Sequence, residues 1–149
     1  MGDYCTLDLH GCSFAVAFEC LREVTEPPLL TPVPLAPAGV RGVVNLRGVL
    51  LPVLALDPLL GLATPESILA RRPWMAVFQS GKHAFGVLAD GVGTARDVVV
   101  EPLPGESAAN PFIEGTIPAA DAEPAVLNVS ALLRQISETL RESTSFSSL

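Results

Sequence analysis

The chain has 149 residues, of which 49% are hydrophobic and 17% charged, and its formal net charge is −7. This composition predicts a globular domain, excludes a disordered chain, and argues against nucleic-acid binding, which needs clustered Lys and Arg. The N-terminus lacks a basic signal-peptide start, and the longest apolar run, Val49–Leu56, is far shorter than the ~20 residues of a membrane helix. We therefore expect a cytoplasmic protein.

The first half of the chain predicts short strands joined in two hairpins. Tyr4–Leu9 and Ser13–Phe18 flank a glycine-containing turn, and Gly42–Leu62 holds two apolar runs divided by the tetrad Asn45–Gly48. The pair Arg47–Gly48 stands where this second hairpin would reverse, and glycine supplies the positive φ needed there. A lone arginine at so apolar a tip is either a solvated turn residue or a charge that faces a partner.

Proline and glycine punctuate the rest of the chain. The fourteen prolines break up long helices, and their clusters at 27–37 and 102–118 are expected to be extended or irregular connections. Trp74–Gln79 and Ala84–Ala89 predict a third hairpin around a glycine turn.

Two helices are predicted. One is a single turn near Glu19–Val24, and the other begins at Ser130 as its N-cap. The apolar positions that fall on one face of this second helix are Leu132, Leu133, Ile136 and Leu140. Residues 143–149 are expected to be a flexible tail.

The two halves of the chain repeat weakly. Corresponding pairs are Phe14 with Phe85 at an offset of 71, and Gly42 with Gly115 and Leu54 with Leu127 at an offset of 73. A half of about 70 residues is small for an independent core. The repeat therefore predicts two small barrels packed on each other, with a seam where a partner could bind.

Some predicted strands carry hydrophobic groups on both faces, because Val43–Val44 and Leu50–Leu51 are adjacent apolar pairs. One face would meet the core of a barrel, and the other would meet either the sister barrel or another protein. Pro52 inside the run predicts a sheet edge or a bulge there.

No catalytic or metal-binding arrangement stands out. Cys12 beside His10 lacks an orienting third group, so a thiol hydrolase is only a remote alternative. The cysteines Cys5, Cys12 and Cys20 lack the spacing of a zinc site or a disulfide framework and are expected to be free thiols. The glycines of Gly86–Gly93 do not form a phosphate-binding loop. We expect no enzyme activity, no cofactor and no metal.

The segment GVVNLRGVLLPVLAL at residues 42–56 resembles the signature of the CheW-like domain family, the scaffold and coupling proteins of bacterial chemosensory arrays. Leu21–Val24 is similar to a short helical segment of that family, and Phe85–Val92 resembles its second-barrel motif. Val126–Leu133 resembles the final strand running into the terminal helix. In this order and spacing, the segments cover nearly the whole chain.

The resemblance implies a mainly β fold of two intertwined SH3-like five-stranded barrels packed together, with a C-terminal helix. Residues 1–149 would form a single domain, with about 1–15 plus 45–72 and 73–130 contributing to the two subdomains through a crossover. It further implies a stand-alone, non-enzymatic adaptor that joins the cytoplasmic tips of chemoreceptors to the regulatory domain of the histidine kinase CheA. Such an adaptor would work at membrane-associated receptor arrays without inserting into the membrane.

Four positions match family residues associated with partner contact: Leu21, Glu23, Gly42 and Arg47. For Arg47, a charge-assisted partner contact and a locally bonded turn residue are both open readings. For Glu23, the alternative is a solvated carboxylate. Gly42 is expected to serve a close backbone approach rather than direct binding.

Three residues of the second half, Val87, Leu88 and Val92, are candidates for an apolar groove that would take a pair of receptor helices, with core packing as the alternative. The sequence departs from the family at Ala55, where an aspartate is usual, and at Asp57, where a basic residue is common. These departures leave open a divergent scaffold that serves twitching or gliding rather than swimming.

Overall fold

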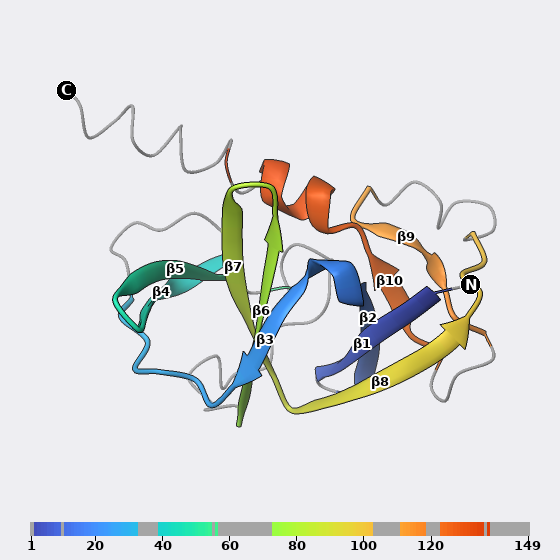
Figure 1. Cartoon of the computed structure of the whole chain (residues 1–149), viewed down its shortest axis with the longest axis horizontal. Coiled ribbons are helices and arrows are strands. Elements are labelled where there is room, and N and C mark those ends of the chain that lie inside the picture. The colour runs from blue at the N-terminus through green and yellow to red at the C-terminus, as the bar shows by residue number, and fades with distance from the viewer. Residues whose placement is uncertain are drawn as a thin grey trace.

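The computed structural model describes residues 2–9, 11–32, 39–54, 56, 73–102, 111–118, 123–135 and 137. These residues form a mainly β structure with two five-stranded sheets and one C-terminal helix, as the sequence predicts (Figure 1). His10, Ala55, Asp57 and the tail at 143–149 lie outside the described residues. Within the described part of the chain, no helix has the length and apolar character needed to cross a bilayer.

The strands divide between two sheets. Sheet A consists of β1 (Gly2–Leu9), β2 (Cys12–Ala17), β8 (Gly91–Val98), β9 (Ile113–Thr116) and β10 (Ala125–Leu127), in the order β8-β1-β2-β10-β9. Sheet B consists of β3 (Leu21–Thr25), β4 (Val40–Leu46), β5 (Val49–Leu54), β6 (Trp74–Ser80) and β7 (His83–Ala89), in the order β3-β6-β7-β5-β4.

The three predicted hairpins are confirmed as β1–β2, β4–β5 and β6–β7. Each turns on two residues, because the last paired positions are Leu9 with Cys12, Leu46 with Val49, and Ser80 with His83. A glycine with positive φ stands in each turn, as two-residue hairpin loops require.

The predicted helix over Glu19–Val24 is wrong. Only Phe18–Cys20 forms a short 3₁₀ turn, η1, and Leu21–Thr25 is strand β3, which pairs with β6. Pairing with β6 gives the backbone of this segment its hydrogen bonds, and that tertiary gain overrides a weak local helix preference. The turn η1 carries the chain from sheet A into sheet B.

The C-terminal helix begins two residues earlier than predicted, because residues 129–135 are helical. The side-chain oxygen of Asn128 accepts a hydrogen bond from the Ala131 N–H at 3.1 Å, so Asn128 is the N-cap and Ser130 lies inside the first turn. Leu132 and Leu133 are buried, as their spacing predicts. The side chains of Ile136 and Leu140 lie outside the described residues.

Each sheet takes strands from both halves of the chain. Strands β1–β5 of the first half correspond, in order, to strands β6–β10 of the second half. Replacing each strand of sheet A by its counterpart gives the strand order of sheet B. The exchange occurs at two parallel pairings, β2 with β10 and β7 with β5, which align Ala15 with Val126 and Gly86 with Val53. The repeat is therefore present in the fold, but neither half forms a sheet by itself.

Each sheet closes on itself through an isolated bridge. Thr31, which follows edge strand β3, exchanges backbone hydrogen bonds of 2.8 and 2.9 Å with Val43 on the opposite edge strand β4. Glu101, which follows β8, does the same with Thr116 on β9, at 2.8 Å for both bonds. Two five-stranded barrels result, and the two bridges that close them occupy equivalent places in the repeat.

The glycine before each bridge makes closure possible. A Cβ built on Gly42 would overlap the carbonyl oxygen of Thr31, and one on Gly115 would overlap that of Glu101. Both glycines therefore serve a close backbone approach, which is the role expected of Gly42 from the sequence.

Three apolar clusters fill the molecule. One lies inside barrel B, a smaller one inside barrel A, and the largest, which we call the seam core, packs between the two sheets. Strand β6 shows the division, because Met75 and Val77 point into barrel B while Ala76 and Phe78 point into the seam core. The second apolar face of this strand thus meets the sister barrel, one of the two alternatives left open by the sequence.

Replacing Gly42 by alanine should lower the free energy of unfolding by about 2 kcal/mol or more, because the added methyl group meets backbone that cannot move without opening the barrel. Chemical denaturation measures this change. Gly81→Ala is the matched control: Gly81 also has positive φ (61°), but nothing lies within 4 Å of its added Cβ, so it should cost only about 1 kcal/mol. Equal losses in the two variants would contradict the proposed closure contact.

Candidate partner-binding site

The β4–β5 turn has the backbone of a type I′ turn, because both central residues have positive φ: 50° at Arg47 and 88° at Gly48. Asn45 adds a side-chain bond, in which its Oδ1 accepts the Gly48 N–H at 2.8 Å. Positive φ is unfavourable for an arginine by about 1 kcal/mol. An arginine held in this conformation at a hairpin tip indicates a role beyond making the turn.

The guanidinium of Arg47 pairs with the carboxylate of Glu23, through Nη2 and Oε1. Glu23 lies on β3 and Arg47 at the end of β4, which are the two edge strands of sheet B. These edges meet only because the sheet closes, so barrel closure brings together two of the candidates singled out by the sequence.

The ion pair is largely exposed to solvent. The side chain of Arg47 is 65% exposed and that of Glu23 is 24% exposed. Ion pairs of this kind contribute only about 0–1 kcal/mol to stability. Most of the guanidinium surface therefore remains available for contact with another molecule.

Exposed apolar residues adjoin the pair in the chain. Val49 (49% exposed) and Leu50 (68%) follow the turn directly, and Val24 (36%) follows Glu23. We call Glu23, Val24, Arg47, Val49 and Leu50 the hairpin patch. An arginine beside exposed aliphatic groups is a combination typical of protein interfaces rather than of solvated turns.

Sequence reasoning singled out Arg47 and Glu23 but not the apolar members of the hairpin patch. The available signal was the run Val49–Leu51, since three consecutive apolar residues of a strand cannot all face one core. Leu51 is buried in barrel B, and Leu50 points to the other side. Leu54, on the same face of β5, belongs to the seam core, whereas Leu50 near the turn is left 68% exposed.

The other sequence candidates lie in packed positions away from the tip. Val87 is 2% exposed in the seam core, Leu88 is 7% exposed inside barrel B, and Val92 and Leu21 pack partly buried against the seam core. Gly42 is buried at the closure bridge. Partner contact through these residues stays a prediction, while their positions give each of them a packing role.

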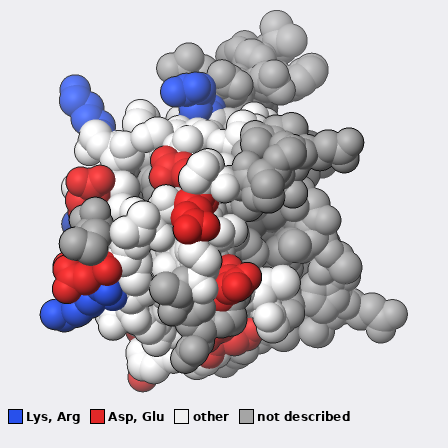
Figure 2. Space-filling model, turned by 90° about the vertical axis from the view of Figure 1, so that its right-hand side faces the viewer, with Lys and Arg blue, Asp and Glu red and all other residues white. Residues whose placement is uncertain are grey.

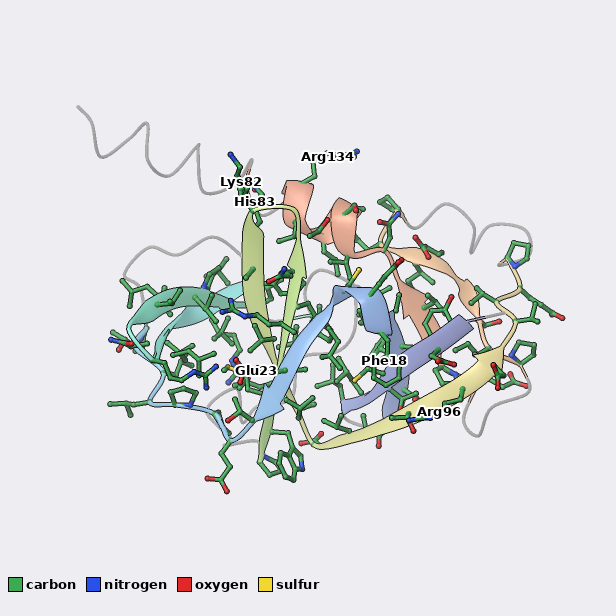
Figure 3. All side chains as sticks on the ribbon, viewed as in Figure 1. Phe18, Glu23, Lys82, His83, Arg96 and Arg134 are labelled. Atoms are coloured by element: carbon green, nitrogen blue, oxygen red, sulfur yellow. The ribbon has the colours of Figure 1, made fainter. Side chains whose placement is uncertain are left out.

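One further exposed apolar group lies at the end of the seam. Trp74 is 42% exposed at the start of β6, on the same face as Ala76, which pairs with Val24 of β3. Figure 3 shows Glu23 beside β3, whereas Lys82 and His83 stand at the β6–β7 turn and Arg96 lies on β8 in the other sheet.

Two of the three thiols, Cys5 and Cys20, are poorly suited to catalysis. Cys5 is buried, Cys20 is half-buried and Cys12 is exposed. Burial raises the pKa of the Cys5 thiol to about 11, and burial, together with the carboxylates of Glu19 and Glu114, raises the pKa of Cys20. A protonated thiol is a weak nucleophile. In the described ranges, no group of three or more His, Cys, Asp and Glu side chains gathers as a metal site.

Figure 2 shows the face at the β8–β9 end of the molecule. Acidic side chains are spread over its described surface, and basic ones lie at its margins. This distribution agrees with the net charge of −7 and offers no basic stripe for a nucleic-acid backbone on that face.

Two closed sheets packed through a seam core, with a charged and apolar hairpin tip exposed, define a protein-interaction module. The sequence model of the CheW-like domain matches residues 3–137, so the chain belongs to the CheW-like domain family. Proteins of this family are non-enzymatic scaffolds and adaptors, and this chain is accordingly a scaffold or coupling protein of chemosensory signalling.

Similar proteins agree with this assignment. Protein FrzA of Myxococcus xanthus is 36% identical over 126 residues, which cover 80% of this chain and 77% of FrzA. The chemotaxis protein CheW of Rhizobium meliloti (strain 1021) is 35% identical over 94 residues, covering 61% of this chain and 59% of that protein. The crystal structure of the scaffolding protein TtCheW from Thermoanaerobacter tengcongensis has the same fold, with a TM-score of 0.71 at 18% identity over 85% of this chain and 88% of that one.

Thiol labelling at pH 8 should modify Cys12 first. With a pKa of about 11, Cys5 carries a thiolate in only about one molecule in a thousand at that pH, and burial blocks the reagent as well. Mass spectrometry of the alkylated chain should find Cys5 unmodified until denaturant is added. Labelling of Cys5 as fast as Cys12 in the folded protein would contradict its burial.

Proposed function

We propose that this protein couples the cytoplasmic tips of chemoreceptors to the regulatory domain of a CheA-type histidine kinase. The observation that carries the proposal is the Arg47–Glu23 pair, presented at the β4–β5 turn and adjoined in the chain by exposed aliphatic residues. On this proposal, the protein is located at membrane-associated receptor arrays and is held there by its partners.

Comparison of the two barrels supports a partner-binding role for the pair. Sheet A closes through the equivalent bridge, yet Gly93 stands at the position equivalent to Glu23 in the strand register, and Ala120 in the sequence at that equivalent to Arg47. The Ile117 N–H bonds to the Pro124 carbonyl at 3.0 Å, at the place where Val44 pairs with Leu51 in sheet B. Sheet A therefore closes without a Glu–Arg pair at these positions, which supports a role for the Arg47–Glu23 pair beyond closing the sheet.

The chemistry of the hairpin patch suits a helical receptor tip. A partner carboxylate could accept a charge-assisted hydrogen bond from Arg47, while aliphatic side chains of a helix bury Leu50 and Val49 at about 25 cal/mol per Å² of apolar surface. Arginine is one of the residue types that most often dominate the binding energy of an interface.

The alternative is the same scaffold in a pathway that controls twitching or gliding instead of swimming. The match to FrzA extends over 126 residues and the match to the Rhizobium meliloti chemotaxis protein CheW over 94, so the similar proteins include one that is not named as a chemotaxis protein. Both versions require the same fold and the same kind of partner surface. Pull-down from native cells, followed by identification of the captured kinase and receptors, separates them.

Arg47→Glu should weaken binding to a soluble fragment of a chemoreceptor's cytoplasmic hairpin by about tenfold or more, because it reverses the charge that meets the partner. The free energy of unfolding should change by only about 1 kcal/mol, since the Arg47–Glu23 pair is exposed. Calorimetric titration gives the affinity and chemical denaturation the stability.

Arg96→Glu is the control, because Arg96 is also an exposed arginine on a strand but lies in sheet A. It makes the same change in net charge and should leave receptor binding within about twofold of the unmodified chain. Equal losses in the two variants would show that net charge, not the hairpin patch, governs binding. Unfolding of the Arg47 variant would instead assign Arg47 a structural role.

A further inference from the structure

We infer that Asn45 is a positioning residue, which holds the backbone of the β4–β5 turn so that Arg47 is presented to the partner. The inference rests on the proposed function of the hairpin patch and adds a second residue to it. Nothing in the chemistry of Asn45 requires it to touch the partner, because its side-chain oxygen is engaged within its own turn.

The contact that carries the inference joins the side chain of Asn45 to the backbone at Gly48. In the two-residue loop, Leu46 and Val49 form the last strand pair, so the Gly48 N–H lies beyond the ladder between the strands. Asn45 Oδ1 accepts that N–H at 2.8 Å. Asn45 is itself exposed, on the strand position opposite Leu50, and so fills no part of the core.

This bond restrains Arg47 from one side while Glu23 restrains it from the other. Arg47 sits between Asn45 and Gly48 with φ of 50°, a conformation that an arginine leaves readily when the turn is not held. Its guanidinium is paired with Glu23. The side chain is thus fixed at its backbone and at its charged end before a partner arrives, which reduces the entropy lost on binding.

The repeat provides an internal comparison. In the second half, Pro118 takes the place of Asn45, and the place of Arg47 is taken by Ala120. Proline has no side-chain oxygen to accept an amide. The half without a tip arginine therefore also lacks the residue that would position one, although its barrel closes through the equivalent bridge.

A double-mutant cycle tests the inference, with a chemoreceptor cytoplasmic hairpin fragment as the probe. Asn45→Ala should weaken binding about fivefold in the chain with Arg47. In the Arg47→Ala chain, the same change should have no further effect beyond about 1.5-fold, since a residue that acts through Arg47 has nothing left to position. Amide exchange of Gly48, followed by NMR in the free protein, should be faster in Asn45→Ala than in the unmodified chain.

Asn128→Ala is the matched control. It also removes an asparagine Oδ1 that accepts a backbone N–H three residues further on, but at the start of the C-terminal helix. It should lower stability without changing receptor affinity in either Arg47 background.

The possible results separate the two claims. Equal weakening by Asn45→Ala in both backgrounds, no weakening in either, or unchanged Gly48 exchange overturns the positioning role of Asn45. Failure of the unmodified chain to bind the receptor fragment overturns the proposed function instead, and Gly48 exchange then still reports whether Asn45 holds the turn.

Discussion

The structure depends on the exchange of strands between the two halves of the chain. Strand β2 pairs with β10, and strand β7 pairs with β5, both in parallel. Each sheet is therefore built from strands of both halves of the chain. The seam core then buries one face of both sheets against each other. Phe78 and Phe85, paired across β6 and β7 with ring centroids 5.8 Å apart, lie within this core. A fold built in this way has no half that could be stable alone.

Closure of sheet B connects this architecture to the candidate site. The bridge between Thr31 and Val43, which Gly42 permits, brings the two edge strands together and thereby sets Glu23 beside Arg47. The hairpin patch is therefore a product of barrel geometry. Sheet A closes through the equivalent bridge, and its sequence has Gly93 and Ala120 where sheet B has Glu23 and Arg47.

Local chemistry made much of the fold predictable. Glycine turns between apolar runs predicted the hairpins, the repeat predicted two barrels, and adjacent apolar pairs predicted strands with two buried faces. Errors arose where tertiary pairing overrides local preference: Leu21–Thr25 becomes a strand because β6 offers its backbone partners, and Asn128 replaces Ser130 as the helix cap because the helix begins earlier than the apolar pattern indicates.

The candidate site was predictable only in part. The NLRG tetrad marks Arg47 in the sequence, but its contact with a carboxylate on a distant strand depends on closure, which no local pattern records. Val87 and Leu88 illustrate the opposite case, since apolar residues that could line a groove can equally fill a core, and the structure buries both of them. Pattern alone does not say which face of a strand is covered.

The most direct test of the account is amide hydrogen exchange of the full chain at increasing denaturant. Because each sheet contains strands from both halves, the slowest amides of β2 in sheet A and β7 in sheet B should report one common free energy of opening, equal within about 0.5 kcal/mol. Protection that survives in one sheet after the other has opened, with free energies more than about 2 kcal/mol apart, would contradict the intertwined fold on which the candidate site depends.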